Sequence, residues 1–273
     1  MACIRSLAVS VLIAGLACTG CGGGGNSEPA ASAPEPIATQ HVIAYGQSLS
    51  LGERSVNGYP NDLTIPAGTD VGLMFAGGTR PTDLSALVPF AESNRPVDGS
   101  LWGIATPGET PLYGALLVLK GLPGQRIGSA AGRGGTSIAG LGKGSVPYAR
   151  LIGQVRAART LASGYGVPAV IWMQGESDAG NTAYAAQFHQ LVRDLDADIR
   201  AASGQLQPVH FFVCLTAVPE IAQAQRDVAA KVPTVHIACD NSTLAKSDGL
   251  HLTATASRQA GQALGSAIAL LLH

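Results

Sequence analysis

A serine, a histidine and an aspartate in this chain are placed where they could form a nucleophilic site. Ser48 follows the apolar, β-prone run Val42 to Tyr45 and then Gly46, where a strand would pass into a turn. A hydroxyl there would face the crevice at the carboxyl edge of a parallel sheet, where open α/β folds bind ligands. It becomes a nucleophile only when a base lies within hydrogen-bond reach and a third group orients that base.

His251 is the histidine best suited to be that base. Of the six histidines, it alone has an acid three residues before it, in Asp248-Gly249-Leu250-His251. One turn would present both side chains, so that Asp248 could hold one ring nitrogen while the other faces the crevice. Taken alone, an Asp and a His at this spacing are typical of an exposed loop pair, so the interpretation depends on the rest of the site.

Two further stretches could stabilise a developing oxyanion. Ala131 to Ile138 is rich in glycine, whose backbone N–H groups can approach a ligand closely. Glycine-rich phosphate-binding patterns do not fit its spacing. The second stretch runs from Gln174 to Asp178, directly after an apolar run, and the Gln174 amide could donate to an oxyanion. No His, Cys or Asp cluster has metal-ligand spacing, so neither a metal nor a cofactor is predicted.

The elements that must position these side chains alternate between strands and helices. Strands are expected at 37–45, 125–131, 168–173, 209–215 and 234–238, and helices at 110–122, 147–163, 182–202, 219–230 and 254–272. This alternation predicts a three-layer α/β/α sandwich with a parallel sheet of about five strands. The chain has 273 residues and is 46% hydrophobic, enough to bury a full core.

One segment, at about 53–108, does not follow the alternation. It is rich in Gly, Pro, Asn and Asp, with brief apolar runs such as Val71 to Phe75. A loop of this length is usually functional or contains structure of its own. Because it follows Ser48 directly, we expect it to wall the site and set specificity, with Trp102 affecting substrate preference more than the fold.

The amino-terminal residues are not expected to belong to the folded domain. Arg5 precedes an apolar run that suits a secretory signal, so residues 1–20 are predicted to be a signal peptide. Small residues then lead to Cys21, as in bacterial lipoprotein signals, so Cys21 is the predicted lipidation site. Cys18 as the modified residue, or simple cleavage and secretion, are the alternatives. Residues 21–36 resemble a tether, and the domain is expected at 37–273.

Charge excludes one class of partner. Lys and Arg total 17 and Asp and Glu total 18, a formal net charge of -1, so the chain lacks the basic surface of a nucleic-acid binder. The amino-terminal pattern instead predicts a membrane as a partner, reached through the lipid anchor. The sequence leaves the oligomeric state open.

Together, four stretches resemble the SGNH (GDSL-like) hydrolases, in the branch of sialate O-acetylesterases and carbohydrate acetylesterases. They are Gly46-Gln47-Ser48, Gly134-Gly135-Thr136-Ser137, the block from Trp172 to Asp178, and Asp248 with His251. Leu49 stands where that branch usually has asparagine. The resemblance implies a flavodoxin-like fold and an esterase that removes acetyl or another short acyl group from a carbohydrate. The expected substrate partner is therefore a small-molecule or glycan ester.

The resemblance also implies a role for each matching residue. Ser48 would be the nucleophile, His251 the general base and acid, and Asp248 the residue that orients it. The oxyanion would be held by the backbone N–H groups of Ser48 and Gly135 and by the side chain of Gln174. Supporting positions are Gln47, Glu176 and Asp178, of which the two acids are expected to brace the loop. Two alternative functions remain: a non-catalytic carbohydrate-binding envelope lipoprotein, and a lipase or thioesterase on the same fold.

Two cysteines lie within the predicted domain. Cys214 and Cys239 each fall at the end of an expected strand, and the family's sheet order makes those strands neighbours. We expect two buried free thiols, with a disulfide as the alternative, since bonding requires close Cα atoms and suitable Cβ directions.

Overall fold

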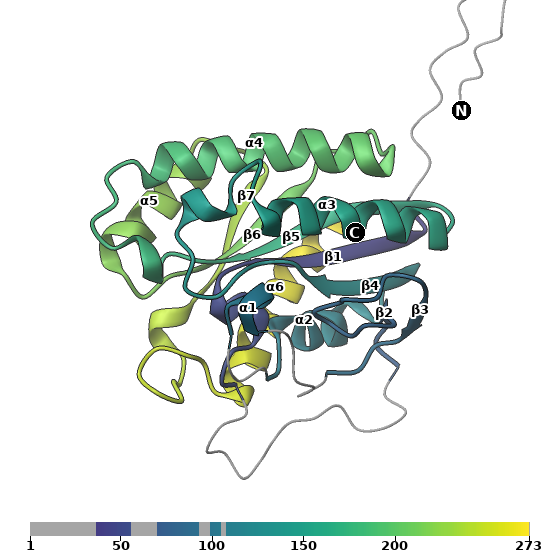
Figure 1. Cartoon of the computed structure of the whole chain (residues 1–273), viewed down its shortest axis with the longest axis horizontal. Coiled ribbons are helices and arrows are strands. Elements are labelled where there is room, and N and C mark those ends of the chain that lie inside the picture. Colours follow the sequence, from purple (N-terminus) through teal and green to yellow (C-terminus); the bar gives the residue numbers. More distant parts are fainter. Residues whose placement is uncertain (1–36, 56–69, 93–98, 105–107, 273) are drawn as a thin grey trace, which may run out of the picture. The chain divides into compact units, whose positions relative to one another are not determined.

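The fold is a seven-stranded sheet covered by helices (Figure 1). The computed structural model describes residues 37–55, 70–92, 99–104 and 108–272. The strands are β1 (Thr39–Gly46), β2 (Leu73–Phe75), β3 (Leu87–Pro89), β4 (Gln125–Ala130), β5 (Tyr165–Met173), β6 (His210–Leu215) and β7 (Val235–Asp240). The α-helices are α1 (Gly99–Trp102), α2 (Pro111–Leu119), α3 (Val146–Leu161), α4 (Tyr184–Ser203), α5 (Pro219–Ala229) and α6 (Ala254–Leu272).

The strand order is β3-β2-β4-β1-β5-β6-β7. All neighbouring pairs are parallel except β2 with β3, so the predicted α/β class and its parallel sheet are confirmed. All five expected strands and all five expected helices are present. In the middle of the sheet, every residue of β5 is buried, as a strand covered on both faces must be.

The helices divide between the two faces of the sheet (Figure 1). Helices α2 and α6 pack together on one face, and α3, α4 and α5 cover the other. Local signals explain where two of them begin. The Thr110 side chain accepts a hydrogen bond from the Leu112 N–H at the start of α2, and Ser145 does the same for the Tyr148 N–H at the start of α3.

The segment at 53–108 contributes structure that the sequence pattern did not reveal. Its strands β2 and β3 extend the sheet beyond β4, so the sheet has seven strands rather than about five. Each is only three residues long, too short to show a periodicity. Trp102 is fully buried, and the Arg150 guanidinium lies 3.8 Å from the centre of its ring. The expectation that Trp102 acts on specificity is therefore wrong: this side chain belongs to the core.

The expectation of two free thiols is also wrong. Cys214 and Cys239 form a disulfide, with their Cα atoms 4.4 Å apart. The two residues stand directly opposite each other on the parallel strands β6 and β7. An irregularity in the register between Val213 and Cys214 precedes this pairing, and a local bulge of that kind cannot be read from alternation along a strand.

The predictions for the amino-terminal region concern residues outside those that the structure describes. They are the signal peptide at 1–20, the lipidation of Cys21 or Cys18, and the tether at 21–36. Within the part of the chain that the structure describes, no helix combines the length and the apolar character needed to span a membrane.

Candidate active site

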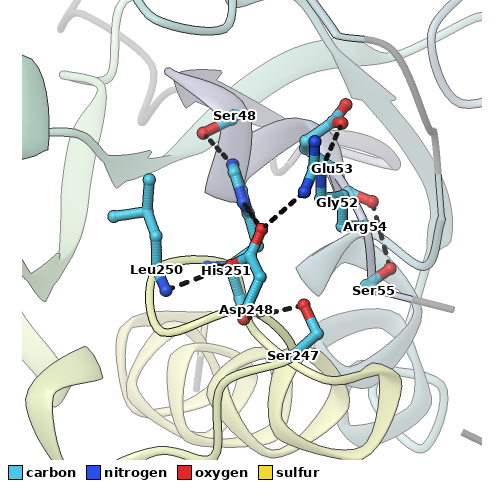
Figure 2. A network of polar contacts seen from close by, with 9 residues as sticks. All are labelled: Ser48, Gly52, Glu53, Arg54, Ser55, Ser247, Asp248, Leu250 and His251. Atoms are coloured by element: carbon cyan, nitrogen blue, oxygen red, sulfur yellow. Dashed lines mark hydrogen bonds and ion pairs between the residues drawn. The ribbon is translucent and has the colours of Figure 1, made fainter. Parts of the chain in front are cut away.

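Ser48, His251 and Asp248 form a continuous hydrogen-bonded chain (Figure 2). The Ser48 Oγ lies 3.1 Å from the His251 Nε2, and the His251 Nδ1 lies 2.9 Å from the Asp248 Oδ2. When Nδ1 carries the proton and donates it to the carboxylate, Nε2 presents its lone pair to the serine hydroxyl. The structure thus brings together, from positions 203 residues apart in the chain, the three side chains expected to act as a unit.

The Asp248 carboxylate is held in its ionised form. Its Oδ1 accepts the backbone N–H groups of His251 at 2.8 Å and Leu250 at 3.1 Å. Desolvation works to raise the pKa of Asp248, but the hydrogen bonds from the backbone and side chain of His251 and from the Leu250 N–H outweigh it, so the pKa lies well below its usual range. A permanent anion beside Nδ1 favours the imidazolium that a general base must become.

The end of β1 places Ser48 at the carboxyl edge of the sheet. Gly46 has a φ of 146°, and a Cβ there would come within 2.1 Å of the Met173 carbonyl oxygen, so only glycine lets the two strand ends approach this closely. Gln47 then donates its N–H to the same carbonyl at 3.0 Å, and its side-chain oxygen accepts the Ser177 N–H at 3.3 Å. Ser48 opens the 3-10 helix η1 (Ser48–Leu51) and is 5% exposed.

Two backbone N–H groups are available for an oxyanion. Within the described residues, the N–H groups of Ser48 and Gly135 donate to no protein acceptor. Gly135 is exposed and has a φ of 59° in a loop that packs against the end of β1. That packing is close, since the Arg133 N–H donates to the Gly46 carbonyl at 3.0 Å. Both residues expected to supply backbone donors therefore lie on neighbouring segments of the same sheet edge.

Gln174 is engaged by the protein rather than open to a ligand. Its Nε2 lies 2.5 Å from the Asp178 Oδ2 and 3.3 Å from the Thr136 carbonyl, while its Oε1 accepts the Tyr184 hydroxyl at 2.9 Å. Two acceptors match the two hydrogens of a side-chain amide. In this arrangement Gln174 cannot donate to an oxyanion unless one of these contacts is released, which departs from the role expected for it.

Glu176 and Asp178 brace the loops around the site. The Glu176 Oε1 accepts the Thr216 hydroxyl and the Asn241 amide, each at 2.9 Å, and so joins the carboxyl ends of β5, β6 and β7. The Asp178 Oδ2 accepts the Ile138 N–H at 2.8 Å. These contacts agree with the bracing role expected for the two acids.

Several residues of the site could not be predicted from the sequence. Arg54 donates from Nη1 to the Asp248 Oδ2 at 3.1 Å, and Tyr184, Thr216 and Asn241 hold the loop that carries Gln174 and Glu176. Arg54 could not be identified from local sequence spacing, because its partner Asp248 lies 194 residues further along the chain. In the described residues, no group of three or more His, Cys, Asp or Glu side chains could hold a metal ion.

A family model described as carbohydrate esterase, sialic acid-specific acetylesterase matches residues 120–269, more than half of the chain. The chain belongs to this family of carbohydrate esterases, and it is a carboxylic ester hydrolase. The matched residues include Gly135, Gln174, Asp248 and His251, and Ser48 precedes them. The comparison with curated protein sequences gives no match.

Solved structures show the same fold. A protein from Arabidopsis thaliana superposes with a TM-score of 0.65 at 22% identity, over 87% of this chain and 100% of that one. NanS gives a TM-score of 0.59 at 16% identity, over 87% and 98% of the two chains. A carbohydrate acetylesterase from Xanthomonas citri gives 0.54 at 17% identity, over 82% of this chain and 55% of that one. The similarity to SGNH-type hydrolase structures thus holds for the architecture as a whole.

Proposed function

We propose that this carbohydrate esterase is a serine hydrolase that removes acetyl or another short acyl group from a carbohydrate, with Ser48 as nucleophile. The observation that carries the proposal is the uninterrupted contact from the Ser48 Oγ through the His251 imidazole to the Asp248 carboxylate. A nucleophile, its base and the group that orients the base are the minimum set for acyl transfer through a covalent intermediate.

In the first half of the reaction, the Ser48 Oγ bonds to the ester carbonyl carbon while its proton passes to the His251 Nε2. The N–H groups of Ser48 and Gly135 are the proposed donors to the oxyanion, and each such donor is worth roughly 3 kcal/mol of barrier. His251 then returns the proton to the departing sugar oxygen, which leaves an acyl group on Ser48. In the second half, water attacks this acyl-enzyme by the same route and releases the carboxylic acid.

Two observations support a small acyl group on a carbohydrate. The family is described as a carbohydrate esterase, sialic acid-specific acetylesterase. Leu250, between the two triad residues of its loop, is 43% exposed. An exposed apolar side chain at this place could contact the methyl group of an acetyl ester.

The proposal is tested by hydrolysis of p-nitrophenyl esters of increasing chain length, together with acetylated sugars including O-acetylated sialic acid. We expect the highest kcat/KM on acetyl esters and release of acetate from at least one sugar. An organophosphonate inhibitor should modify a single residue, so that mass spectrometry finds its added mass only on the peptide that contains Ser48. Ser266→Ala, on the exposed side of α6, is the matched serine control and should label normally. Labelling elsewhere, or a preference for long chains, would contradict the proposal.

We also propose that the enzyme acts outside the cytoplasm, as a lipid-anchored protein of a bacterial cell envelope or as a secreted protein. The amino-terminal pattern ending at Cys21 supports export. The Cys214–Cys239 disulfide supports it independently, because disulfides persist mainly in oxidising compartments. Mass spectrometry of protein from membrane and soluble fractions should find a lipid-modified amino terminus at Cys21. A cytoplasmic chain that retains residues 1–20 would contradict both forms of the proposal.

A further inference from the structure

Arg54 provides a second link between the segment that carries Ser48 and the loop that carries His251. The first link is the contact of Ser48 with His251, and the second joins the Arg54 Nη1 to the Asp248 Oδ2 at 3.1 Å (Figure 2). The Glu53 N–H donates to the Ser48 carbonyl at 3.0 Å, so Arg54 and Ser48 belong to one compact turn. The two links close a ring through the backbone of residues 48–54.

The oxygen that Arg54 contacts is the one that accepts the His251 proton. The Asp248 Oδ2 receives both Arg54 Nη1 and His251 Nδ1, while Oδ1 receives two backbone N–H groups. The carboxylate is therefore oriented by four donors, of which Arg54 is the one contributed by the nucleophile segment. The positive charge of Arg54 at this oxygen also neutralises part of the negative charge of Asp248, which would otherwise stabilise a protonated His251 imidazole.

The backbone at Arg54 is unusual. It has a φ of 56°, and among the residues that the structure describes it is the one non-glycine residue with a positive φ. This conformation is disfavoured for residues with a Cβ, and such residues tend to occur at functional sites. The turn around it is well fixed, since the Ser55 hydroxyl donates to the Glu109 carbonyl at 2.9 Å.

We propose that Arg54 is a positioning residue of the active site, which holds Asp248 and through it His251 in register with Ser48 and limits how strongly Asp248 favours the imidazolium. The proposal rests on the serine-hydrolase function proposed above. The Arg54 side chain is 46% exposed, so the ion pair contributes little to stability, and its effect is on orientation and charge.

Among the described residues, Glu53 and Lys246 are further charged side chains on the segments that carry Ser48 and His251, and Glu109 pairs with Arg258 on α6. Replacing Arg54 by methionine removes its cation and leaves the others in place. The imidazolium should then be favoured by the unopposed charge of Asp248. The acid limb of the kcat/KM profile should therefore move to higher pH, and kcat should fall as the loop loses a link.

The experiment measures kcat and kcat/KM of the full chain on p-nitrophenyl acetate across pH. For Arg54→Met we expect kcat at its pH optimum to fall roughly three- to tenfold and the acid limb to move up by about half a pH unit. Arg54→Lys keeps a cation and should restore the position of the acid limb, with kcat only partly recovered. Arg200→Met is the matched control, because Arg200 is 40% exposed and pairs with Asp196 on α4.

The outcomes separate this proposal from the function on which it rests. If Ser48→Ala abolishes hydrolysis but Arg54→Met has the same kcat and pH profile as Arg200→Met, the role of Arg54 is refuted and the serine mechanism stands. A fall in kcat with an unmoved acid limb and a lower unfolding midpoint would show a structural role only, and would also overturn the proposal. Activity that does not depend on Ser48 would overturn both.

Discussion

His41 gives a pH-dependent stability whose size can be worked out from its surroundings. It lies on β1 with no exposed surface, and its ring nitrogens contact the Tyr165 hydroxyl at 2.8 Å and the Ser129 hydroxyl at 2.7 Å. Burial lowers the pKa of His41 from 6.5 to about 3. The folded protein thus keeps this ring neutral at pH values where the unfolded chain protonates it.

The sign follows from the lowered pKa. The stabilising contribution of neutral His41 is complete above the unfolded value of 6.5 and is lost as the pH falls toward about 3. The full difference corresponds to roughly 5 kcal/mol, and about 2 kcal/mol of it is lost between pH 7.5 and pH 5. His41→Asn cannot titrate, so it lacks this loss, although it should be less stable than the wild type at pH 7.5.

Urea unfolding at pH 7.5, 6 and 5 tests this reasoning. The difference in unfolding free energy between wild type and His41→Asn should shrink by about 2 kcal/mol as the pH falls from 7.5 to 5. His189→Asn, an exposed position on α4, is the control and should follow the wild type at all three pH values. A difference for His41→Asn that stays constant with pH would refute the argument.

Three further predictions concern other parts of the chain. Replacing Cys214 and Cys239 by alanine should lower the unfolding free energy by about 3 to 4 kcal/mol, from the 25-residue separation that the disulfide closes; a reductant should destabilise the wild type but leave the variant unchanged. Trp102→Ala should lower the free energy of unfolding, measured by urea titration, by roughly 3 to 5 kcal/mol, with relative rates on different esters unchanged. An altered ester preference in a variant as stable as the wild type would contradict the burial of Trp102. Asp248→Asn should lower kcat roughly 10³- to 10⁴-fold with the fold intact by circular dichroism; a loss below tenfold would show that His251 does not need this carboxylate.

The core of the fold could be predicted because its central elements are long enough to show either a continuous apolar run or a helical period. The buried run of β5 and the helix from 254 to 272 are of this kind, and both were found from the sequence. Strands β2 and β3 have three residues each, and their burial depends on their neighbours in the sheet, so the sequence pattern alone does not reveal them.

The candidate site was predictable where chemistry ties residue types to local spacing. Asp248 and His251 occupy one turn, and Ser48 follows a strand, so each could be singled out within a short window. Contacts made across the fold could not be found in this way. The engagement of the Gln174 amide by Asp178 and Thr136, and of Asp248 by Arg54, depend on how distant loops meet at the sheet edge.

The most direct test of the serine mechanism is the kcat/KM of Ser48→Ala on p-nitrophenyl acetate, measured beside the wild type and the Ser266→Ala control. Removal of the hydroxyl deletes the group that forms the acyl-enzyme, while Ser48 lies in a turn that alanine can also adopt. We predict a loss of at least about 10³-fold in kcat/KM with an unchanged circular dichroism spectrum. A folded Ser48→Ala protein that hydrolyses the ester at the wild-type rate would contradict the mechanism.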